Sequence, residues 1–101
     1  MFIANILVMY SIANTPSKVL LQLAKRHKSI RKKQKLSQVD LAKKSGVSLG
    51  SLKRFEQIGQ ISLESLLKLV HVLNRLDEFD ALLQPKADLS AINQLFSEDM
   101  Q

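Results

Sequence analysis

SQVDLAKKSGVSLGSLKRFEQ, residues 37–57, predicts two short helices joined by a tight turn, and the rest of the chain is arranged as support for this stretch. Ser37 is expected to cap the first helix, because a serine hydroxyl accepts a free backbone N–H of the first turn, and Asp40 completes a capping box. Gly46 follows that helix, where glycine adopts a positive φ without steric cost. Ser48 is expected to cap the second helix.

The second helix of this stretch has one apolar face and one polar face. Leu52 and Phe55, three residues apart, join Leu41 and Val47 in an apolar seam that holds the two helices at a fixed angle. The opposite face carries residues three or four positions apart: Leu49, Gly50, Lys53, Arg54 and Gln57. This arrangement predicts a helix-turn-helix whose second helix lies in the major groove of DNA. The alternative is a solvent-exposed helix in an all-α domain.

The charge of the chain is unevenly distributed. The 101 residues predict a single domain, and their net charge is +6. Residues 25–54 hold eleven basic side chains against Asp40 alone, whereas residues 76–101 hold six acidic side chains against Lys86 alone. A basic body of this kind predicts a polyanionic partner. The absence of cysteine excludes disulfides and thiolate metal sites, and it suits a reducing cytoplasm.

The first 14 residues form an apolar arm that begins MFIANILVMYSIA. The arm is too short to span a bilayer and lacks the pattern of a signal peptide, so we expect a cytoplasmic protein. Its β-branched and aromatic content predicts a short strand, which needs a pairing partner. Alternatively, Met9 is the natural start and the first eight residues are an extension.

Residues 15–84 predict one all-α domain of five helices. The first helix starts at Thr15 and Pro16, because proline is tolerated at the first helical position, and it extends to about Lys35. Its expected buried stripe is Leu20, Leu23, Ala24, His27 and Ile30. Ser62 and Glu64 open the fourth helix, which ends near Asn74. Its expected core face is Leu63, Leu66, Leu67, Val70 and Leu73.

The end of this domain predicts a short fifth helix that stops at Pro85. Residues 85–101 form an acidic tail that is either flexible or a small amphipathic helix. We expect His27 and His71 to pack at the edge of the core rather than bind a metal, since no other ligand type stands at metal-site spacing. No catalytic set, glycine-rich phosphate loop or paired acidic motif is present. The sequence therefore predicts a binding protein that is not an enzyme and needs no cofactor.

LSQVDLAKKSGVSLGSLKRFE followed by SLESLLKLVHVLNRLDEFDALL resembles the Xre or phage-repressor-like helix-turn-helix family over about residues 18–83. The resemblance implies that Gln38 holds a phosphate at the start of the first helix of the motif. It also implies that bases or nearby phosphates meet Ser48, Leu49, Gly50, Lys53 and Arg54, and we include Ser51 in this DNA-binding set. Family members often carry glutamine or asparagine early in the second helix. Leu49 and Gly50 stand there instead, so Arg54 is expected to carry more of the specificity.

Three further expectations concern contacts. Arg31, on the edge of the first helix's buried stripe, is expected to form an ion pair with Glu56, a link that the resemblance also suggests. Lys32 is expected to meet DNA phosphates. One recognition helix reads too few base pairs for useful specificity, so we expect a homodimer on a palindromic operator, with Phe79 and Leu83 at the dimer interface.

The segments SGVSLGSLKRFE and GQISLESLLKL resemble, in particular, the small HipB-like regulators that accompany HipA-type kinase toxins. This implies an antitoxin that represses its own operon and has a HipA-like kinase as its protein partner. Three alternatives remain: a stand-alone repressor, a nucleic-acid binder without sequence preference, and an adaptor whose basic face meets an acidic protein. A steep salt dependence common to all DNA would indicate non-specific binding.

Overall fold

The computed structural model describes residues 14–86, and within them the chain forms five helices and no strand. The helices are α2 (Pro16–Lys33), α3 (Gln38–Ser45), α4 (Leu49–Ile58), α5 (Leu63–Val72) and α6 (Leu76–Asp80). The prediction of an all-α, five-helix domain is therefore confirmed. The predicted N-terminal strand and the predicted tail helix lie outside the described residues.

Four of the helices begin at a side-chain cap, as the sequence predicts. The hydroxyl of Thr15 accepts the backbone N–H of Lys18, with Pro16 at the first position of α2. Ser37 and Asp40 form the predicted capping box of α3, with bonds of 3.0 and 3.2 Å in the two directions. Ser48 and Ser62 likewise begin α4 and α5. Each cap satisfies a backbone N–H that the helix itself leaves free.

The core lies where α2, α3, α4 and α5 meet. α2 packs against α4, and α3 packs against both α4 and α5. The largest fully buried side chains of the core are Phe55, Leu41, Leu52, Leu69 and Leu73. Val47, in the turn between α3 and α4, is also buried, so all four residues of the predicted apolar seam lie in the core.

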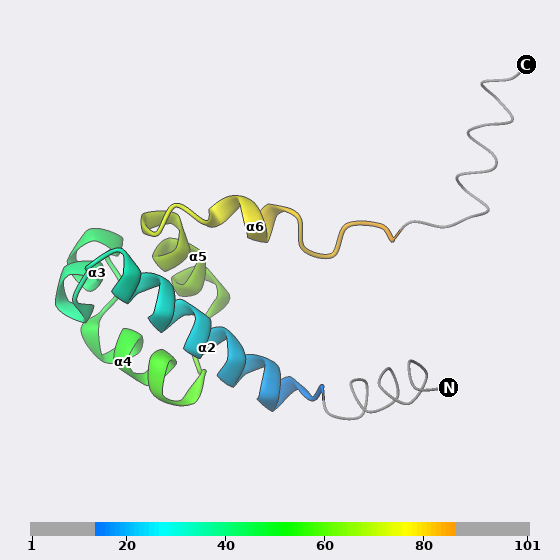
Figure 1. Ribbon diagram of the computed structural model, residues 1–101, viewed down its shortest axis with the longest axis horizontal. Helices are drawn as coiled ribbons and strands as arrows, with labels where there is room; N and C mark the ends of the chain where they lie inside the picture. Colours follow the sequence, from blue (N-terminus) through cyan, green and yellow to red (C-terminus); the bar gives the residue numbers. More distant parts are fainter. Residues whose placement is uncertain (1–13, 87–101) are drawn as a thin grey trace, which may run out of the picture.

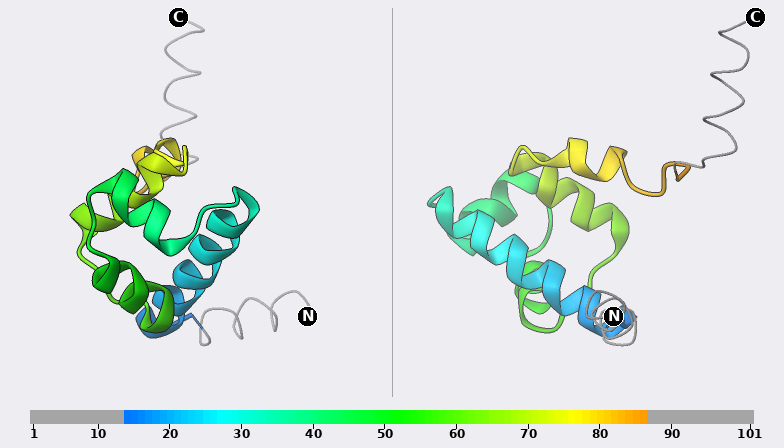
Figure 2. Two further views of the ribbon diagram at one scale, coloured as in Figure 1. Left: turned by 90° about the vertical axis from the view of Figure 1, so that its left-hand side faces the viewer. Right: turned by 45° about the vertical axis from the view of Figure 1, so that its right-hand side comes forward.

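The helices surround this core so that α4 and α6 lie on opposite sides of it (Figure 1). The two turned views show the same separation of α4 from α6 (Figure 2). Contact between α6 and the rest of the domain is made mainly through α5. The exposed surface of α4 therefore lies on the other side of the core from α6.

Helix α2 differs from the prediction in its C-terminal end and in the burial of its first turns. It ends at Lys33 rather than at Lys35, because Lys35 has a φ of 59° and lies outside the helical region. Leu20, expected in the buried stripe, is 43% exposed. The first turns of α2 extend past the core, and the backbone and Cβ of Leu20 lie close to Gly59.

Three further predictions, all in the second half of the domain, are wrong. Leu63, expected in the core, is 65% exposed because it stands in the first turn of α5 beyond the packed region, whereas Leu69 is fully buried and was not predicted. His71 is exposed rather than packed at the core edge. α6 ends at Asp80, five residues before Pro85, and a turn with Leu83 at a φ of 59° follows it.

Candidate nucleic-acid interface

The turn between α3 and α4 has the geometry that the sequence predicts. Gly46 ends α3 with a φ of 76°, and its N–H bonds to the carbonyl of Ala42. The hydroxyl of Ser45 accepts the N–H of Val47, whose side chain is buried beneath the turn. Two residues after Gly46, Ser48 begins α4. The turn therefore fixes α4 relative to α3 through backbone conformation and burial together.

The buried and exposed faces of α4 are sharply separated. Leu52 and Phe55 are 0% and 1% exposed and anchor the helix to the core. The opposite side presents exposed polar and small residues: Gly50, Ser51, Lys53, Arg54 and Gln57. Leu49 is half-buried at the start of the helix, and the hydroxyl of Ser48 caps it by accepting the N–H of Ser51. The structure thus brings Ser48, Leu49, Gly50, Ser51, Lys53 and Arg54 onto one exposed surface.

Behind this surface, Arg31 of α2 holds Glu56 of α4. Arg31 donates from Nε to Oε2 of Glu56 at 2.9 Å and from Nη2 to Oε1 at 2.8 Å. A third bond, from Nη1, reaches the carbonyl of Leu36 at 2.8 Å. Both charged side chains are more than nine-tenths buried. The predicted partners are therefore in bidentate contact, a geometry that strengthens an ion pair and fixes its orientation.

The same carboxylate has two partners that the sequence analysis did not find. Nδ1 of His27 lies 2.9 Å from Oε2 of Glu56, and Nε2 of Gln38 donates to Oε1 at 3.0 Å. His27 stands four residues before Arg31, so it shares a face of α2 with it, and this spacing was the available signal. Gln38, predicted to hold a phosphate, is half-buried and already gives one amide hydrogen to Glu56.

The electrostatics of this cluster follow from burial and hydrogen bonding. Burial lowers the pKa of His27 below its ordinary value, and the hydrogen bond with Glu56 offsets this only in part. For Glu56, burial raises the pKa, but hydrogen bonds donated by Arg31 and Gln38 outweigh it and hold the pKa low. Glu56 is therefore ionised at neutral pH and accepts every bond it makes, while the His27 ring is neutral.

Arg54 has an exposed partner in the loop after α4. Its Nη2 donates to Oε1 of Gln60 at 2.6 Å. Gln60 follows Gly59, whose φ of 78° turns the chain back toward α4. This role of Gln60 could not be predicted from the sequence, because the contact depends on the direction in which Gly59 turns the chain. The guanidinium of Arg54 is thus oriented at the edge of the exposed α4 surface.

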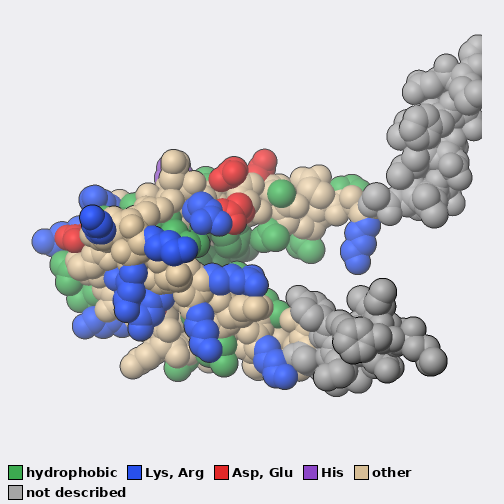
Figure 3. Space-filling model, viewed as in Figure 1, with side chains coloured by type: hydrophobic (Ala, Val, Ile, Leu, Met, Phe, Trp, Pro, Cys, Tyr) green, Lys and Arg blue, Asp and Glu red, His purple; other side chains and the backbone are tan. Residues whose placement is uncertain are grey.

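Basic side chains surround this surface (Figure 3). Of the eleven basic residues between 25 and 54, only Arg31 is buried, and Lys32 is exposed in the last turn of α2. Acidic side chains gather instead at α6, where Arg75 is bonded to Glu78. Among residues 14–86, the only exposed acidic side chain on α3 or α4 is Asp40, which takes part in the capping box of α3.

The structure places the remaining predicted site residues apart from this surface. Phe79 is half-buried and packs against the core, and Leu83 is fully exposed in the turn after α6.

Residues 14–86 contain no group of three His, Asp or Glu side chains arranged to hold a metal ion. No helix within the same residues is long and apolar enough to cross a membrane.

Comparison with known proteins identifies the family of this chain. A family model described as helix-turn-helix matches residues 28–79, which run from the last third of α2 into α6 and include the whole of α3, α4 and α5. No curated protein matches the chain. The family match covers more than half of the sequence, and it spans the capped turn, the buried ion pair and the exposed face of α4. The chain therefore belongs to the helix-turn-helix family of the Xre and phage-repressor type and is a DNA-binding transcription regulator.

Proposed function

We propose that the protein is a sequence-specific repressor that inserts α4 into the major groove of a palindromic operator. The observation that carries this proposal is the division of α4 between a fully buried apolar face and an exposed face with Lys53 and Arg54. The bidentate Arg31–Glu56 pair anchors the end of that helix from behind. A helix held this rigidly can present the same side chains to DNA each time it binds.

Within this proposal the exposed residues have different roles. Arg54 reads a base edge, because a guanidinium can bond a guanine in two places, and Gln60 keeps it oriented. Lys32 and Lys53 meet phosphates. Gln38 uses its second amide hydrogen for a phosphate while the first holds Glu56. The remaining members of the DNA-binding set, at the start of α4, approach bases or nearby phosphates: Ser48, Leu49, Gly50 and Ser51.

The operator is palindromic in this proposal because two copies bind as a homodimer. Two recognition helices about 34 Å apart read successive major grooves, which one helix alone cannot do. The end of α6 supports this arrangement, since Leu83, in the turn after that helix, is an apolar side chain that is 102% exposed. Phe79, the other candidate, contributes only the part of its ring that its own core leaves uncovered.

Selection of binding sites from random duplex DNA tests the repressor proposal directly. We expect an enriched palindrome whose half-sites are one helical turn apart, bound about 10³-fold or more tightly than random DNA at physiological salt. Steep salt dependence with no enriched sequence would instead indicate a non-specific nucleic-acid binder. No binding to any duplex, together with capture of an acidic protein, would indicate an adaptor.

We propose further that the protein is the antitoxin of a HipA-like kinase toxin and represses their shared operon. The resemblance of SGVSLGSLKRFE and GQISLESLLKL to HipB-like regulators supports this assignment, and so does sequence at both ends that a helical unit of this size does not need for its operator. Co-expression with the downstream gene product, followed by affinity purification, is the test. If no neighbouring protein co-purifies and cells tolerate that neighbour alone, the protein is a stand-alone repressor.

A further inference from the structure

A shallow, open depression with an apolar wall lies where α3, α4 and the turn between them meet. The carbon surface of this α3–α4 depression is supplied by four side chains: Val39, Ala42, Val47 and Leu49. Val39 is 45% exposed, and Ala42 and Leu49 are half-buried, so much of this surface is open to a binding partner. Ser48 and Leu49 belong both to the depression and to the exposed surface of α4, which makes the two continuous.

The polar groups at the start of α4 are partly engaged with one another. The hydroxyl of Ser48 accepts the N–H of Ser51 at 3.1 Å and donates to the hydroxyl of Ser51 at 2.8 Å. Gly50 has no side chain, and a methyl group at its position would meet nothing within 4 Å. This open position beside Leu49 lets the edge of a base approach the carbon surface of the depression.

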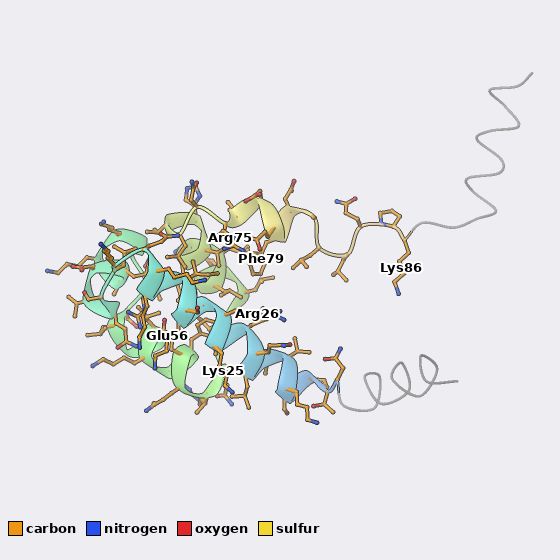
Figure 4. The ribbon with its side chains drawn as sticks, in the orientation of Figure 1. Lys25, Arg26, Glu56, Arg75, Phe79 and Lys86 are labelled. Atoms are coloured by element: carbon orange, nitrogen blue, oxygen red, sulfur yellow. The ribbon has the colours of Figure 1, made fainter. Side chains whose placement is uncertain are left out.

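Both ends of α4 are held, so the position of Leu49 is well defined. At the start of the helix, the side chain of Val47 is buried beneath the turn. Near its end, Glu56 lies between α4 and α2 (Figure 4), where Arg31 bonds to its carboxylate in two places. A rigid apolar surface can distinguish partners that differ by one methyl group, because it relaxes only partly into the space that a missing methyl group leaves.

The chemistry around the α3–α4 depression indicates what it receives. Lys43 is exposed and contributes to its wall, whereas the acidic side chains of α3 and α4 are the capping Asp40 and the buried Glu56. These surroundings suit a polyanion such as DNA. On base-pair edges in the major groove, the apolar group is the C5-methyl group of thymine, which cytosine lacks. Uracil lacks it as well, and 5-methylcytosine carries it at the same place.

We propose that the α3–α4 depression receives the C5-methyl group of one pyrimidine in each half-site of the operator. The methyl group lies against Val39, Ala42 and Leu49, so the first turn of α4 reads thymine, or 5-methylcytosine, by contact with carbon. This inference rests on the proposed insertion of α4 into the major groove, and it adds what the start of that helix recognises. Arg54, further along α4, supplies the hydrogen-bonding contact.

Replacement of the thymines of the selected operator by deoxyuridine, one position of each half-site at a time, tests the proposal. This change removes only the C5-methyl group and keeps the hydrogen-bonding edge of the base. With the full chain at one salt concentration, we expect one thymine position at which replacement weakens binding about 3- to 6-fold per half-site, the effect of one methyl group leaving an apolar contact. At the same position, 5-methylcytosine should bind more tightly than cytosine by a similar factor.

The outcomes separate this inference from the proposed function. If an operator is selected but no replacement of thymine by deoxyuridine weakens binding, the inference is overturned and the repressor proposal stands. A half-site without any thymine would overturn it in the same way. If no operator is selected at all, the repressor proposal fails, and the inference that rests on it fails too.

Two variants assign the methyl group to the depression. Leu49→Asn replaces carbon by a polar group of similar size and should bring the ratio of thymine to deoxyuridine affinities close to one. Leu63→Asn is the matched control, because Leu63 also follows the serine cap of a helix and is 65% exposed outside the depression, so it should leave the ratio unchanged.

Val39→Thr, which keeps the shape of an exposed side chain, should also lower the ratio and serves if Leu49→Asn does not fold. A ratio that persists in both variants would place the methyl group against other residues and contradict the assignment. An unchanged ratio together with a larger dimer dissociation constant in sedimentation would instead assign the depression to a contact between two copies of the chain.

Discussion

Glu56 is the residue at which three helices are joined. It belongs to α4, and its carboxylate accepts hydrogen bonds from Arg31 and His27 of α2 and from Gln38 of α3. A buried ion pair adds less stability than its bonds suggest, because desolvation opposes them. Loss of one partner lowers the stability strongly, since the other charge is then left buried without compensation.

We expect Arg31→Leu and Glu56→Leu each to lower the free energy of unfolding by about 3 to 5 kcal/mol. The double variant should lose less than the sum of the two, because it leaves no stranded charge. Urea unfolding of the four proteins in the cycle measures this coupling. If the loss of the double variant equals the sum of the two single losses, the side chains of Arg31 and Glu56 are not energetically coupled.

The pKa of His27 predicts how stability changes with pH. Burial lowers this pKa below 6.5 in the folded protein, so the unfolded chain takes up a proton at a higher pH than the folded chain does. Stability should therefore be complete above about pH 6.5 and should fall as the pH is lowered through that value. The low pKa of Glu56 adds a second loss at more acidic pH. Urea midpoints from about pH 8 to 3 test this, and His27→Gln should remove the first loss while retaining the second.

Two residues of the exposed α4 face should behave differently on DNA. Arg54→Ala should cost about 1 to 3 kcal/mol on the preferred operator and relax the preference at one base pair. Lys53→Ala should weaken binding to all sequences and reduce the salt slope by about 1. Fluorescence anisotropy with operator and random duplexes at several salt concentrations separates the two. Equal losses on both duplexes for Arg54→Ala would exclude a base-reading role.

At the scale of the helices, two glycines join α4 to its neighbours in the same conformation but in different surroundings. Gly46 and Gly59 have φ values of 76° and 78°. A methyl group at Gly46 would meet nothing within 4 Å, whereas at Gly59 it would lie 2.9 Å from the backbone of Leu20. The backbone of α2 cannot move aside as a flexible side chain could.

Substitution by alanine should lower the free energy of unfolding by different amounts at the two glycines. Gly46→Ala should cost about 1 to 2 kcal/mol, the usual penalty for a left-handed residue with a Cβ. Gly59→Ala should cost distinctly more, because the same penalty is joined by a clash with α2. Thermal or urea unfolding of both variants provides the comparison, and similar losses would mean that α2 and the loop after α4 are not in close contact.

The helices themselves could be predicted from local signals. Serine caps, Pro16 and Gly46 act within a few residues of where they stand, so their effects are visible in the sequence. Burial at the helix ends could not be predicted in this way. Leu20 and Leu63 fit the apolar period of their helices, yet both lie past the region where another helix covers them. The period shows which face is apolar but not how far along it the neighbouring helix reaches.

The candidate site could likewise be predicted only in part from the sequence. The exposed face of α4 follows from the position of its apolar residues, and the pairing of Arg31 with Glu56 follows from charge, helix face and family resemblance together. The roles of His27 and Gln60 could not be deduced, because each depends on the placement of a side chain from a distant segment. Gln38 was assigned to a phosphate, and its bond to Glu56 depends equally on tertiary packing.

At the scale of the whole molecule, the separation of α6 from α4 allows dimerisation to be tested without altering the DNA-binding surface. Leu83 is fully exposed and contributes nothing to its own core, unlike Phe79. Leu83→Asp should therefore raise the dimer dissociation constant at least about tenfold, or 1.4 kcal/mol, if this side chain is central to the interface. Sedimentation velocity measures the change. Leu63→Asp, at another exposed leucine on α5, is the control, and an equal effect of both would argue against an interface at Leu83.

The basic side chains gather mainly on α2, α3 and α4 and the acidic side chains on α6, which gives the domain an electric dipole (Figure 3). In the field of a polyanion such a dipole experiences a torque that turns α4 toward the nucleic acid and α6 away from it before the two molecules touch. The rotational search for a productive encounter is shortened accordingly. Reversal of the charges on Asp77, Glu78 and Asp80 would reduce that torque without changing a single residue of the α4 surface.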